Sequence, residues 1–235
     1  VHLWYPDIMQ GSTLPTAMLV ATWQKLAPLT LLYLIYPSNP ALILIISLIS
    51  TTIGGWGGLN QTQTRKIMAF SSIAHMGWLL AALTISSPLT TLTMLIYLVT
   101  TTATFTALTA TKSKTIPDLG TTWTSSTPMT ATMLVLLLSL GGLPPLTGFM
   151  PKLLIANELT SLDLAPLTIA LLLTSLPSLY FYTRVSYSLT LTAPPTTLCN
   201  KMMWRTTLKP QQLMLPLATA ATMLMPLTPT LFNTT

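Results

Sequence analysis

One apolar run, from about Met129 to about Asn157, constrains the fold of this chain more than any other stretch. A straight helix of that length would reach roughly 43 Å at ~1.5 Å per residue, whereas the hydrocarbon core of a bilayer is about 30 Å thick. The middle of the run carries helix-breaking residues: Gly141, Gly142, Pro144, Pro145 and Gly148. Adjacent prolines remove backbone donors and clash with the preceding turn. The run therefore predicts a discontinuous helix, two halves with a break around Gly141–Gly148 at membrane depth.

The composition places the rest of the chain in a membrane as well. Only 6% of the 235 residues are charged and 51% are hydrophobic, whereas a soluble domain carries about a quarter charged residues. Apolar segments of ~20 residues indicate helices, since a membrane barrel would show ~10-residue alternation. We expect an all-α polytopic transmembrane helix bundle that forms a single domain over residues 1–235. Its predicted spans are 14–36, 41–56, 60–84, 88–110, 129–157 (broken), 165–188 and 211–232.

The loops between these spans divide the charges unequally. Loops 57–66, 111–128 and 189–210 fall on one side of the membrane if the spans alternate, and we call this side the basic face. Its lysines and arginines are Arg65, Lys66, Lys112, Lys114, Lys201, Arg205 and Lys209. The loops of the opposite face contain no Lys or Arg, and their acids are Glu158 and Asp163. By the positive-inside rule the basic face is the cytoplasmic or matrix side. We interpret these cations as topological and lipid-headgroup charges, and we expect no nucleic-acid partner.

Two lysines fall inside predicted spans. Lys25 lies eleven residues into its span, about 16 Å deep by helical rise, where a charge costs at least ~2.5–3.5 kcal/mol. Because burial disfavours the charged form of an amine, a lysine at this depth can gain or lose a proton. Lys152 follows the break directly, and a broken helix with a buried charge is typical of ion pathways. The alternative is that each lysine only hydrogen-bonds a neighbouring helix.

A histidine is predicted at the same depth. His75 lies nine residues beyond Lys66, about 13 Å deeper into the membrane. Nearby hydroxyl and amide side chains come from Gln61, Gln63, Thr64, Ser71 and Ser72. We expect Lys25, His75 and Lys152 to form a polar layer that passes protons along the membrane plane, although a lone buried histidine is more often a satisfied core residue. Glu158 is a weaker candidate, either an acid on the exit side or an interfacial carboxylate.

Other classes of site are disfavoured by the residues present. One cysteine, Cys199, and two histidines, His2 and His75, are too few for an iron–sulfur cluster or a closed zinc site. The glycine-rich segment Gly54–Gly58 fails the phosphate-loop pattern because Asn60 stands at the third glycine position. We therefore expect the chain itself to bind no metal, nucleotide or flavin.

Five motifs occur in order along the chain: HLWYPD at His2–Asp7, TWQKLAP at Thr22–Pro28, GGLNQTQTRKI at Gly57–Ile67, SSIAHMGW at Ser71–Trp78 and LGGLPPLTGFMPK at Leu140–Lys152. Together they resemble the subunit 2 family of mitochondrial NADH–ubiquinone oxidoreductase (respiratory complex I), with a weaker match over 189–235. This family is similar to the membrane subunits of Mrp-type cation/proton antiporters, and the resemblance implies a fold of two inverted five-helix repeats, each with a discontinuous helix. The threonine- and methionine-rich filler is similar to vertebrate, mitochondrially encoded membrane subunits.

The resemblance assigns roles to the three candidate residues. It implies that Lys25 is the central connecting lysine, that His75 lies between two half-channels, and that Lys152 is the lysine of the second broken helix. The family's upstream glutamate and lysine have no counterpart here, and the chain begins at Val1 rather than Met. We therefore expect an N-terminally truncated sequence.

The resemblance also implies a function. The chain is expected to be a core membrane subunit of complex I, taking part in proton translocation coupled to electron transfer from NADH to ubiquinone. It would lie in the mitochondrial inner membrane with its basic face in the matrix, beside other membrane subunits and phospholipids such as cardiolipin. NADH, FMN, iron–sulfur clusters and ubiquinone would belong to the complex, because the chain itself carries no redox centre. The alternatives are an Mrp-like cation/proton antiporter subunit or a non-pumping scaffold subunit.

Overall fold

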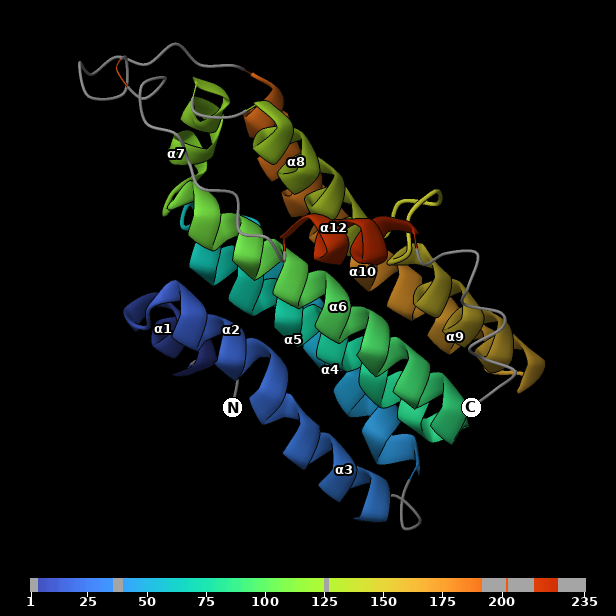
Figure 1. The fold of residues 1–235 in the computed structure, drawn as a ribbon. Coiled ribbons are helices and arrows are strands. Elements are labelled where there is room, and N and C mark those ends of the chain that lie inside the picture. The colour runs from blue at the N-terminus through green and yellow to red at the C-terminus, as the bar shows by residue number, and fades with distance from the viewer. Residues whose placement is uncertain (1–3, 36–39, 125–126, 192–201, 203–213, 224–235) are drawn as a thin grey trace.

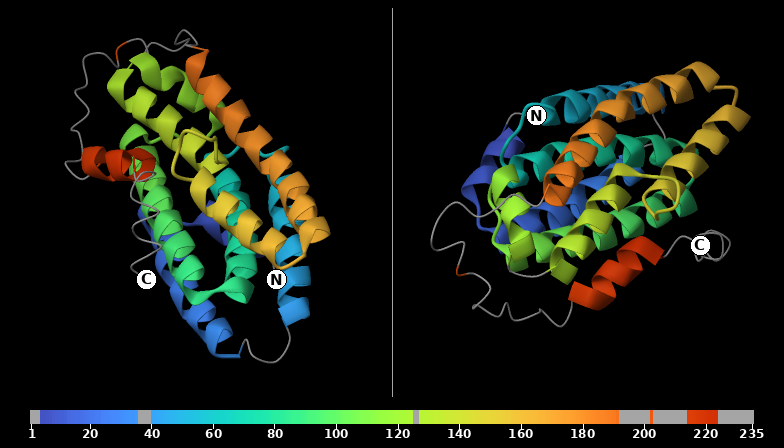
Figure 2. Two further views of the ribbon diagram at one scale, coloured as in Figure 1. Left: turned by 90° about the vertical axis from the view of Figure 1, so that its right-hand side faces the viewer. Right: turned by 90° about the horizontal axis from the view of Figure 1, so that it is seen from above.

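The computed structural model describes residues 4–35, 40–124, 127–191, 202 and 214–223. Regular secondary structure in this part of the chain is helical throughout (Figure 1), as the composition predicted. Stretches long and apolar enough to cross a bilayer are Leu14–Leu34, Pro40–Gly58, Thr64–Ile85, Ser87–Thr111 and Ala165–Thr190. They lie side by side as a bundle in Figures 1 and 2, and within the first four of these stretches the chain reverses direction from one to the next.

The second span, α4 (Pro40–Gly58), shows how the bundle faces lipid. Its exposed side chains are large and apolar: Leu42, Ile45, Ile46, Ile49 and Ile53. Its buried side is small and polar, with Ser47, Ser50, Thr51 and Gly54. Lipid tails are as apolar as leucine, so close packing of small residues and interhelical hydrogen bonds hold membrane helices together. The arrangement therefore fits a bundle embedded in lipid.

Helix α4 packs closely against α5 (Thr64–Ile85), the most buried of the long helices. A Cβ atom added at Gly54 would lie 2.8 Å from the Cα atom of Ala74, and one at Gly77 would lie 2.8 Å from the carbonyl oxygen of Ser47. These glycines let the two backbones approach each other, which fixes the position of α5 at the centre of the bundle. The next helix, α6 (Ser87–Thr111), covers another side of α5.

The first span is interrupted, which the sequence did not predict. It consists of α2 (Leu14–Thr22), a single 3-10 turn η1 (Trp23–Lys25) and α3 (Leu26–Ile35). Pro28 lacks a backbone donor for the carbonyl of Gln24, and its ring crowds that carbonyl. The backbone tightens one turn before this proline, so Lys25 lies at an irregularity rather than in a continuous helix.

The discontinuous helix is confirmed. It consists of α8 (Thr127–Gly141) and α9 (Phe149–Ser161), joined by the loop 142–148. Gly142 has φ +82°, a left-handed conformation that glycine adopts at little cost. A Cβ atom at Gly148 would lie 3.0 Å from the carbonyl carbon of Ser139, so the loop folds tightly against the end of α8. The return helix α10 (Ala165–Thr190) then runs back along the bundle.

The predicted span 211–232 does not appear as one long helix in the described residues. Its described part is the helix α12 (Met214–Met223), which lies within the predicted span. It packs on α6 and α8 at an angle to the bundle (Figure 1), and Thr147 of the break donates a hydrogen bond to the carbonyl of Ala221. The rest of that predicted span lies outside the described residues.

Short helices occupy two regions for which no span was predicted. They are α1 (Trp4–Gly11), before the first span, and α7 (Ile116–Thr121), which η3 (Thr122–Thr124) extends. Among the candidates singled out in the sequence, His2, Cys199, Lys201, Arg205 and Lys209 lie outside the described residues.

Candidate functional site

The three predicted residues come from three separate elements near the middle of the bundle. Lys25 belongs to η1, His75 to α5 and Lys152 to α9. Each is half-buried and borders a cavity or groove. Their placement at the two helix irregularities and on the central helix gives the site its geometry.

Lys25 is held by neutral oxygen atoms and aromatic rings. Its Nζ atom donates hydrogen bonds to the hydroxyl of Tyr97 at 2.8 Å and to the carbonyl of Ser72 at 3.2 Å. It also lies 4.8 Å from the ring centroid of Tyr97 and 5.5 Å from that of Tyr5, within the range of cation–π attraction. Among the described residues no carboxylate forms an ion pair with Lys25. Its positive charge is therefore stabilised without being neutralised.

Lys152 reaches back across the break of the discontinuous helix. Its Nζ atom donates a hydrogen bond of 3.1 Å to the carbonyl oxygen of Gly141, the last residue of α8. The final carbonyls of a helix lack intrahelical partners and carry the negative end of the helix dipole. The end of α8 thus provides a binding position for the ammonium group, a role that half-helix ends have in membrane transporters.

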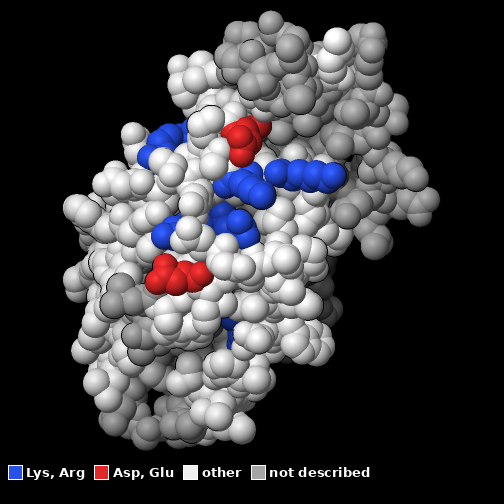
Figure 3. Space-filling model, turned by 90° about the vertical axis from the view of Figure 1, so that its left-hand side faces the viewer, with Lys and Arg blue, Asp and Glu red and all other residues white. Residues whose placement is uncertain are grey.

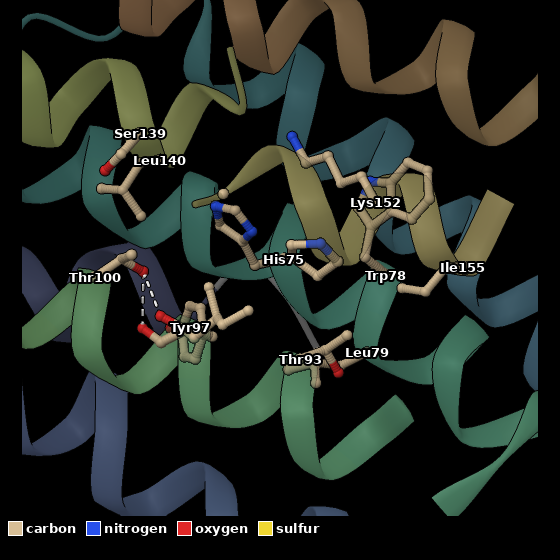
Figure 4. A pocket seen from close by; sticks show the side chains of 13 residues that line it. His75, Trp78, Leu79, Thr93, Tyr97, Thr100, Ser139, Leu140, Lys152 and Ile155 are labelled. Carbon is tan, nitrogen blue, oxygen red and sulfur yellow. Dashed lines mark hydrogen bonds between the residues drawn. The ribbon is translucent and has the colours of Figure 1, made fainter. Parts of the chain in front are cut away.

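His75 borders a small cavity (Figure 4), and its ring packs against Tyr97, the residue that accepts a hydrogen bond from Lys25. The cavity has a volume of about 30 Å³ and is lined by His75, Lys152 and Tyr97, among others. Since a water molecule needs about 10–15 Å³ of such space, one or two waters fit. Thr93, Thr100 and Ser139 also contribute to the lining. We call this space the central cavity.

A group of hydroxyls surrounds His75 and Lys152 on another side. A closely packed region bordered by both residues, with no room for a water molecule, is lined by Thr51, Ser71, Ser175, Ser178 and Tyr182. These residues come from α4, α5 and α10, and the hydroxyls of Thr51 and Thr174 lie 2.9 Å apart. The Tyr182 hydroxyl is buried without a hydrogen-bond partner among the described residues. A polar environment therefore extends from His75 across three helices.

Lys25 also borders a larger groove, which His75 does not line. The groove has a volume of about 310 Å³, and its polar residues include Tyr5, Gln24, Ser50 and Ser72. Tyr97, His75 and Lys152 do not line it. We call this space the outer groove; Lys25 lines it and does not line the central cavity.

Other predicted site residues lie elsewhere. Glu158 is half-buried in the last turn of α9 and lines neither the outer groove nor the central cavity. Gln61 and Gln63 precede α5, where the carbonyl of Gln61 accepts a hydrogen bond from Arg184 and Gln63 pairs with Thr115. Thr64 donates to the carbonyls of Ser113 and Lys114. These two glutamines and Thr64 were expected near the polar layer, and that prediction is wrong, because all three connect loops at the helix ends.

Sequence reasoning missed the two tyrosines of the site. Tyr97 is 4% exposed and Tyr182 is 1% exposed. The position of Tyr97 in the sequence does indicate its depth. It lies ten residues beyond Ser87, at the start of α6, which is about 15 Å along the helix. That depth matches the estimates for Lys25 and His75. Tyr182 carries no comparable signal, because tyrosines recur along α10.

Figure 3 shows lysines and arginines gathered on one part of the surface, with acidic residues beside them. The described basic residues of the predicted loops lie at the start of α5 and just after the end of α6. Arg184 donates hydrogen bonds to the carbonyls of Leu59 at 2.5 Å and Gln61 at 2.6 Å. Arg65 donates to the carbonyl of Ser12, and Lys66 lies 3.9 Å from the carboxylate of Asp7. These contacts tie α10, α5 and α1 together near the start of α5.

Comparisons with known proteins agree with this architecture. A family model described as NADH:quinone oxidoreductase/Mrp antiporter, TM, matches residues 1–177, and one described as NADH dehydrogenase subunit 2 C-terminus matches residues 179–232. Curated relatives named NADH-ubiquinone oxidoreductase chain 2 include one from Tetraodon nigroviridis, 49% identical over 99% of this chain and 68% of its own length. Another, from Ovis aries, is 48% identical over 98% of this chain and 67% of its own length.

A solved structure shows that the similarity extends to the fold. One chain of respiratory complex I from Thermus thermophilus with bound aureothin matches 99% of this chain and 51% of its own length, with 27% identity and a TM-score of 0.76. The present chain thus spans about two thirds of the curated relatives and about half of that solved chain. The chain therefore belongs to the NADH-ubiquinone oxidoreductase chain 2 family, the antiporter-like membrane subunits of the proton-pumping respiratory complex I.

Proposed function

We propose that this chain carries protons through the mitochondrial inner membrane as part of a respiratory NADH–ubiquinone oxidoreductase. Electron transfer from NADH to ubiquinone takes place in other subunits of the assembly, which hold the FMN and the iron–sulfur clusters. The observation that carries the proposal is the grouping of two lysines around His75: Lys152 lines one cavity with His75, and Lys25 and His75 both contact Tyr97. Helix irregularities expose polar backbone beside each lysine, the construction used for ion sites at membrane depth.

Each residue has a distinct part in this proposal. Lys25 stores a proton and releases it toward the central cavity, His75 passes it on, and Lys152 is the terminal carrier. Two ammonium groups in one low-dielectric layer repel each other, so arrival of a proton at one lysine favours its release from the other. This repulsion supplies coupling along the membrane plane without a redox group in the chain.

The break between α8 and α9 links protonation to movement. The hydrogen bond from Lys152 to Gly141 joins the two half-helices across the loop 142–148. A charged lysine binds the end of the α8 dipole more strongly than a neutral one. Loss of the proton therefore weakens the link and lets the half-helices shift, which admits water to one side.

The orientation in the membrane is also a proposal. Arg65 and Lys66 lie in the first turn of α5, Lys112 and Lys114 follow the last residue of α6, and Arg184 lies near the end of α10. These helix ends lie at one end of the bundle (Figure 1). By the positive-inside rule this end faces the matrix. The exposed side chains of Lys112 and Lys114 suit contact with anionic phospholipids such as cardiolipin.

A cation/proton antiporter of the Mrp type is the alternative from the same family. It requires a cation site, for which carboxylates at mid-depth are the expected ligands. Asp7, Asp118 and Asp163 are exposed, and Glu158 lies away from the cavities. Within the described residues no group of three or more His, Cys, Asp or Glu is placed to hold a metal ion. The donor set therefore favours protons as the transported ion.

A scaffold role is the other alternative, and replacements at Lys25 separate it from proton transfer. Lys25→Met removes the charge, whereas Lys25→Arg keeps a charge that cannot be lost. Both are measured in the intact complex in closed vesicles, as NADH oxidation by ubiquinone together with proton movement. Proton transfer predicts that both variants lose coupled turnover. Full activity in the arginine variant would show that Lys25 only needs to be positive, and full activity in both would favour the scaffold.

A further inference from the structure

The proposed proton pathway lacks a direct connection between Lys25 and the central cavity. Lys25 lines the outer groove but not the central cavity, and His75 and Lys152 line the central cavity but not the outer groove. A proton leaving Lys25 therefore needs a group that touches both. Among the described residues that accept a hydrogen bond from the Lys25 ammonium group, Tyr97 is the one that lines the central cavity.

Tyr97 has contacts on both sides of this boundary. Its hydroxyl lies 2.8 Å from the Nζ atom of Lys25. Its ring packs against the imidazole of His75, with centroids 5.6 Å apart and planes inclined by 48°. At 4% exposure the residue is buried, and Leu26, Leu29, Met76 and Leu98 pack around its cluster. The ring is therefore held in place while the hydroxyl hydrogen can rotate.

The hydroxyl proton itself points away from the cavity in this structure. Tyr97 donates it to the carbonyl of Ala21 at 3.0 Å. Ala21 lies near the end of α2, just before the helix tightens into η1, and carbonyls at such changes of hydrogen-bond pattern can accept bonds from side chains. A carbonyl oxygen cannot pass a proton onward. In this arrangement the path for protons from Tyr97 to the central cavity is therefore closed.

We propose that Tyr97 is the bridging residue that passes protons from Lys25 to the central cavity, and that its hydrogen bond to Ala21 holds this step closed. The inference rests on the proposed function and adds to it a residue that connects the two spaces. In the open arrangement the O–H bond turns from Ala21 toward a water molecule in the central cavity. The cavity has room for that water.

The transfer conserves protons at every atom. One N–H bond of the Lys25 ammonium breaks as a new O–H bond forms on Tyr97. The original Tyr97 proton passes to the cavity water, and that water gives a proton to the free nitrogen of His75. Lys25 ends as a neutral amine, His75 ends as a cation, and Tyr97 is neutral before and after. Rotation of the hydroxyl back to Ala21 closes the path again.

Tyr97→Phe is the direct test, because it keeps the ring against His75 and removes only the hydroxyl. It is measured in the intact complex in closed vesicles, beside Lys25→Met. General acid–base groups contribute about 100-fold or more to rate, and we expect a loss of at least about tenfold in coupled turnover, with a flattened pH profile and a reduced solvent deuterium effect. A structural role alone would leave the shape of the pH profile and the deuterium effect unchanged.

Thr104→Val is the matched control. Thr104 is buried in the same helix, and its hydroxyl bonds to the carbonyl of Thr101 at 2.9 Å. The substitution also removes one buried hydroxyl from α6. Because Thr104 does not line the central cavity, we expect normal turnover.

The outcomes separate this inference from the proposed function. Loss of coupled turnover in Lys25→Met with wild-type behaviour in Tyr97→Phe would overturn the bridge and leave the lysine pathway intact. Normal behaviour of both variants would overturn the proposed function as well. If Tyr97→Phe prevents assembly, a high-resolution map of the unaltered complex decides. An ordered water within about 3.2 Å of the Tyr97 oxygen on its cavity side supports the bridge, and a dry cavity refutes it.

Discussion

The two lysines of the site keep their charges available because their partners are neutral. Lys25 donates to a tyrosine hydroxyl and a backbone carbonyl, and Lys152 donates to the last carbonyl of α8. An adjacent carboxylate would pair with the ammonium group and hold its proton in place. Carbonyls and hydroxyls stabilise a cation less strongly, so a small change in geometry can release the proton. This property suits carriers better than structural ion pairs.

Gly142 is the residue on which the position of Lys152 depends most closely. Its φ of +82° favours glycine, and a Cβ atom there would lie 3.0 Å from the Nζ atom of Lys152. We predict that Gly142→Ala lowers the stability of the break by about 1–2 kcal/mol, the usual cost of a left-handed alanine, and reduces coupled turnover. Heat inactivation and NADH oxidation of the complex measure the two effects.

Gly141→Ala is the control for this change. A Cβ atom at Gly141 would meet Tyr182 at an ordinary 3.5 Å, and the carbonyl that accepts the bond from Lys152 is retained. We expect a much smaller effect. Equal losses in the two variants would mean that the break tolerates no added volume at all, and that the left-handed backbone and the lysine are not the cause.

At the scale of the helices, the break between α8 and α9 could be predicted from the sequence. The 3-10 turn between α2 and α3 could not be located from the residues alone. The paired prolines at 144 and 145 interrupt a run that is too long for one span, so length and composition agree. Around Lys25 the span has an ordinary length, and Pro28 alone does not distinguish a kink from a 3-10 turn. The hydrogen bonds that join Tyr97 to Ala21 of α2 and to Lys25 of η1 are contacts between residues far apart in the sequence. The order of residues along one span does not reveal them.

The close packing of α4 on α5 leads to a prediction about stability. Gly54→Ala would place a Cβ atom against the backbone of Ala74, the residue before His75. Overpacking of this kind costs about 1–3 kcal/mol, and the shift of α5 would disturb the central cavity. We predict a lower midpoint of heat inactivation and reduced turnover, compared with Gly11→Ala, where nothing lies within 4 Å of the added atom. Unchanged stability in both variants would show that the two helices can separate freely.

At the scale of the whole molecule, the known thickness of a bilayer allows the depth of a residue in a span to be estimated from the sequence. Counting residues from Lys66 or from the start of a span placed Lys25 and His75 near the centre, and the structure gives both a contact with Tyr97. The direction in which a side chain points cannot be obtained in this way. Tyr97 and Tyr182 were missed for that reason, since a tyrosine in an apolar span can face lipid or the interior equally well.

The alternation of the spans predicts which side of the membrane each loop faces. Lys112 and Lys114 are exposed near the start of α7, at the end of the bundle assigned to the matrix. A membrane-impermeant amine reagent should modify them in inner-membrane vesicles whose matrix side faces outward, and not in mitoplasts. Detergent-solubilised complex is the control for coverage by other subunits. Modification in mitoplasts would reverse the proposed orientation.

The measurement that tests the central claim most directly is the number of protons moved per NADH oxidised by the intact complex carrying Lys152→Met. The side chain keeps much of its length and loses the amine that binds the end of α8 and lines the central cavity. We predict that the assembled complex moves fewer protons per NADH or loses coupled turnover. A normal ratio at a normal rate would contradict the account, because protons would then cross without the amine at the break.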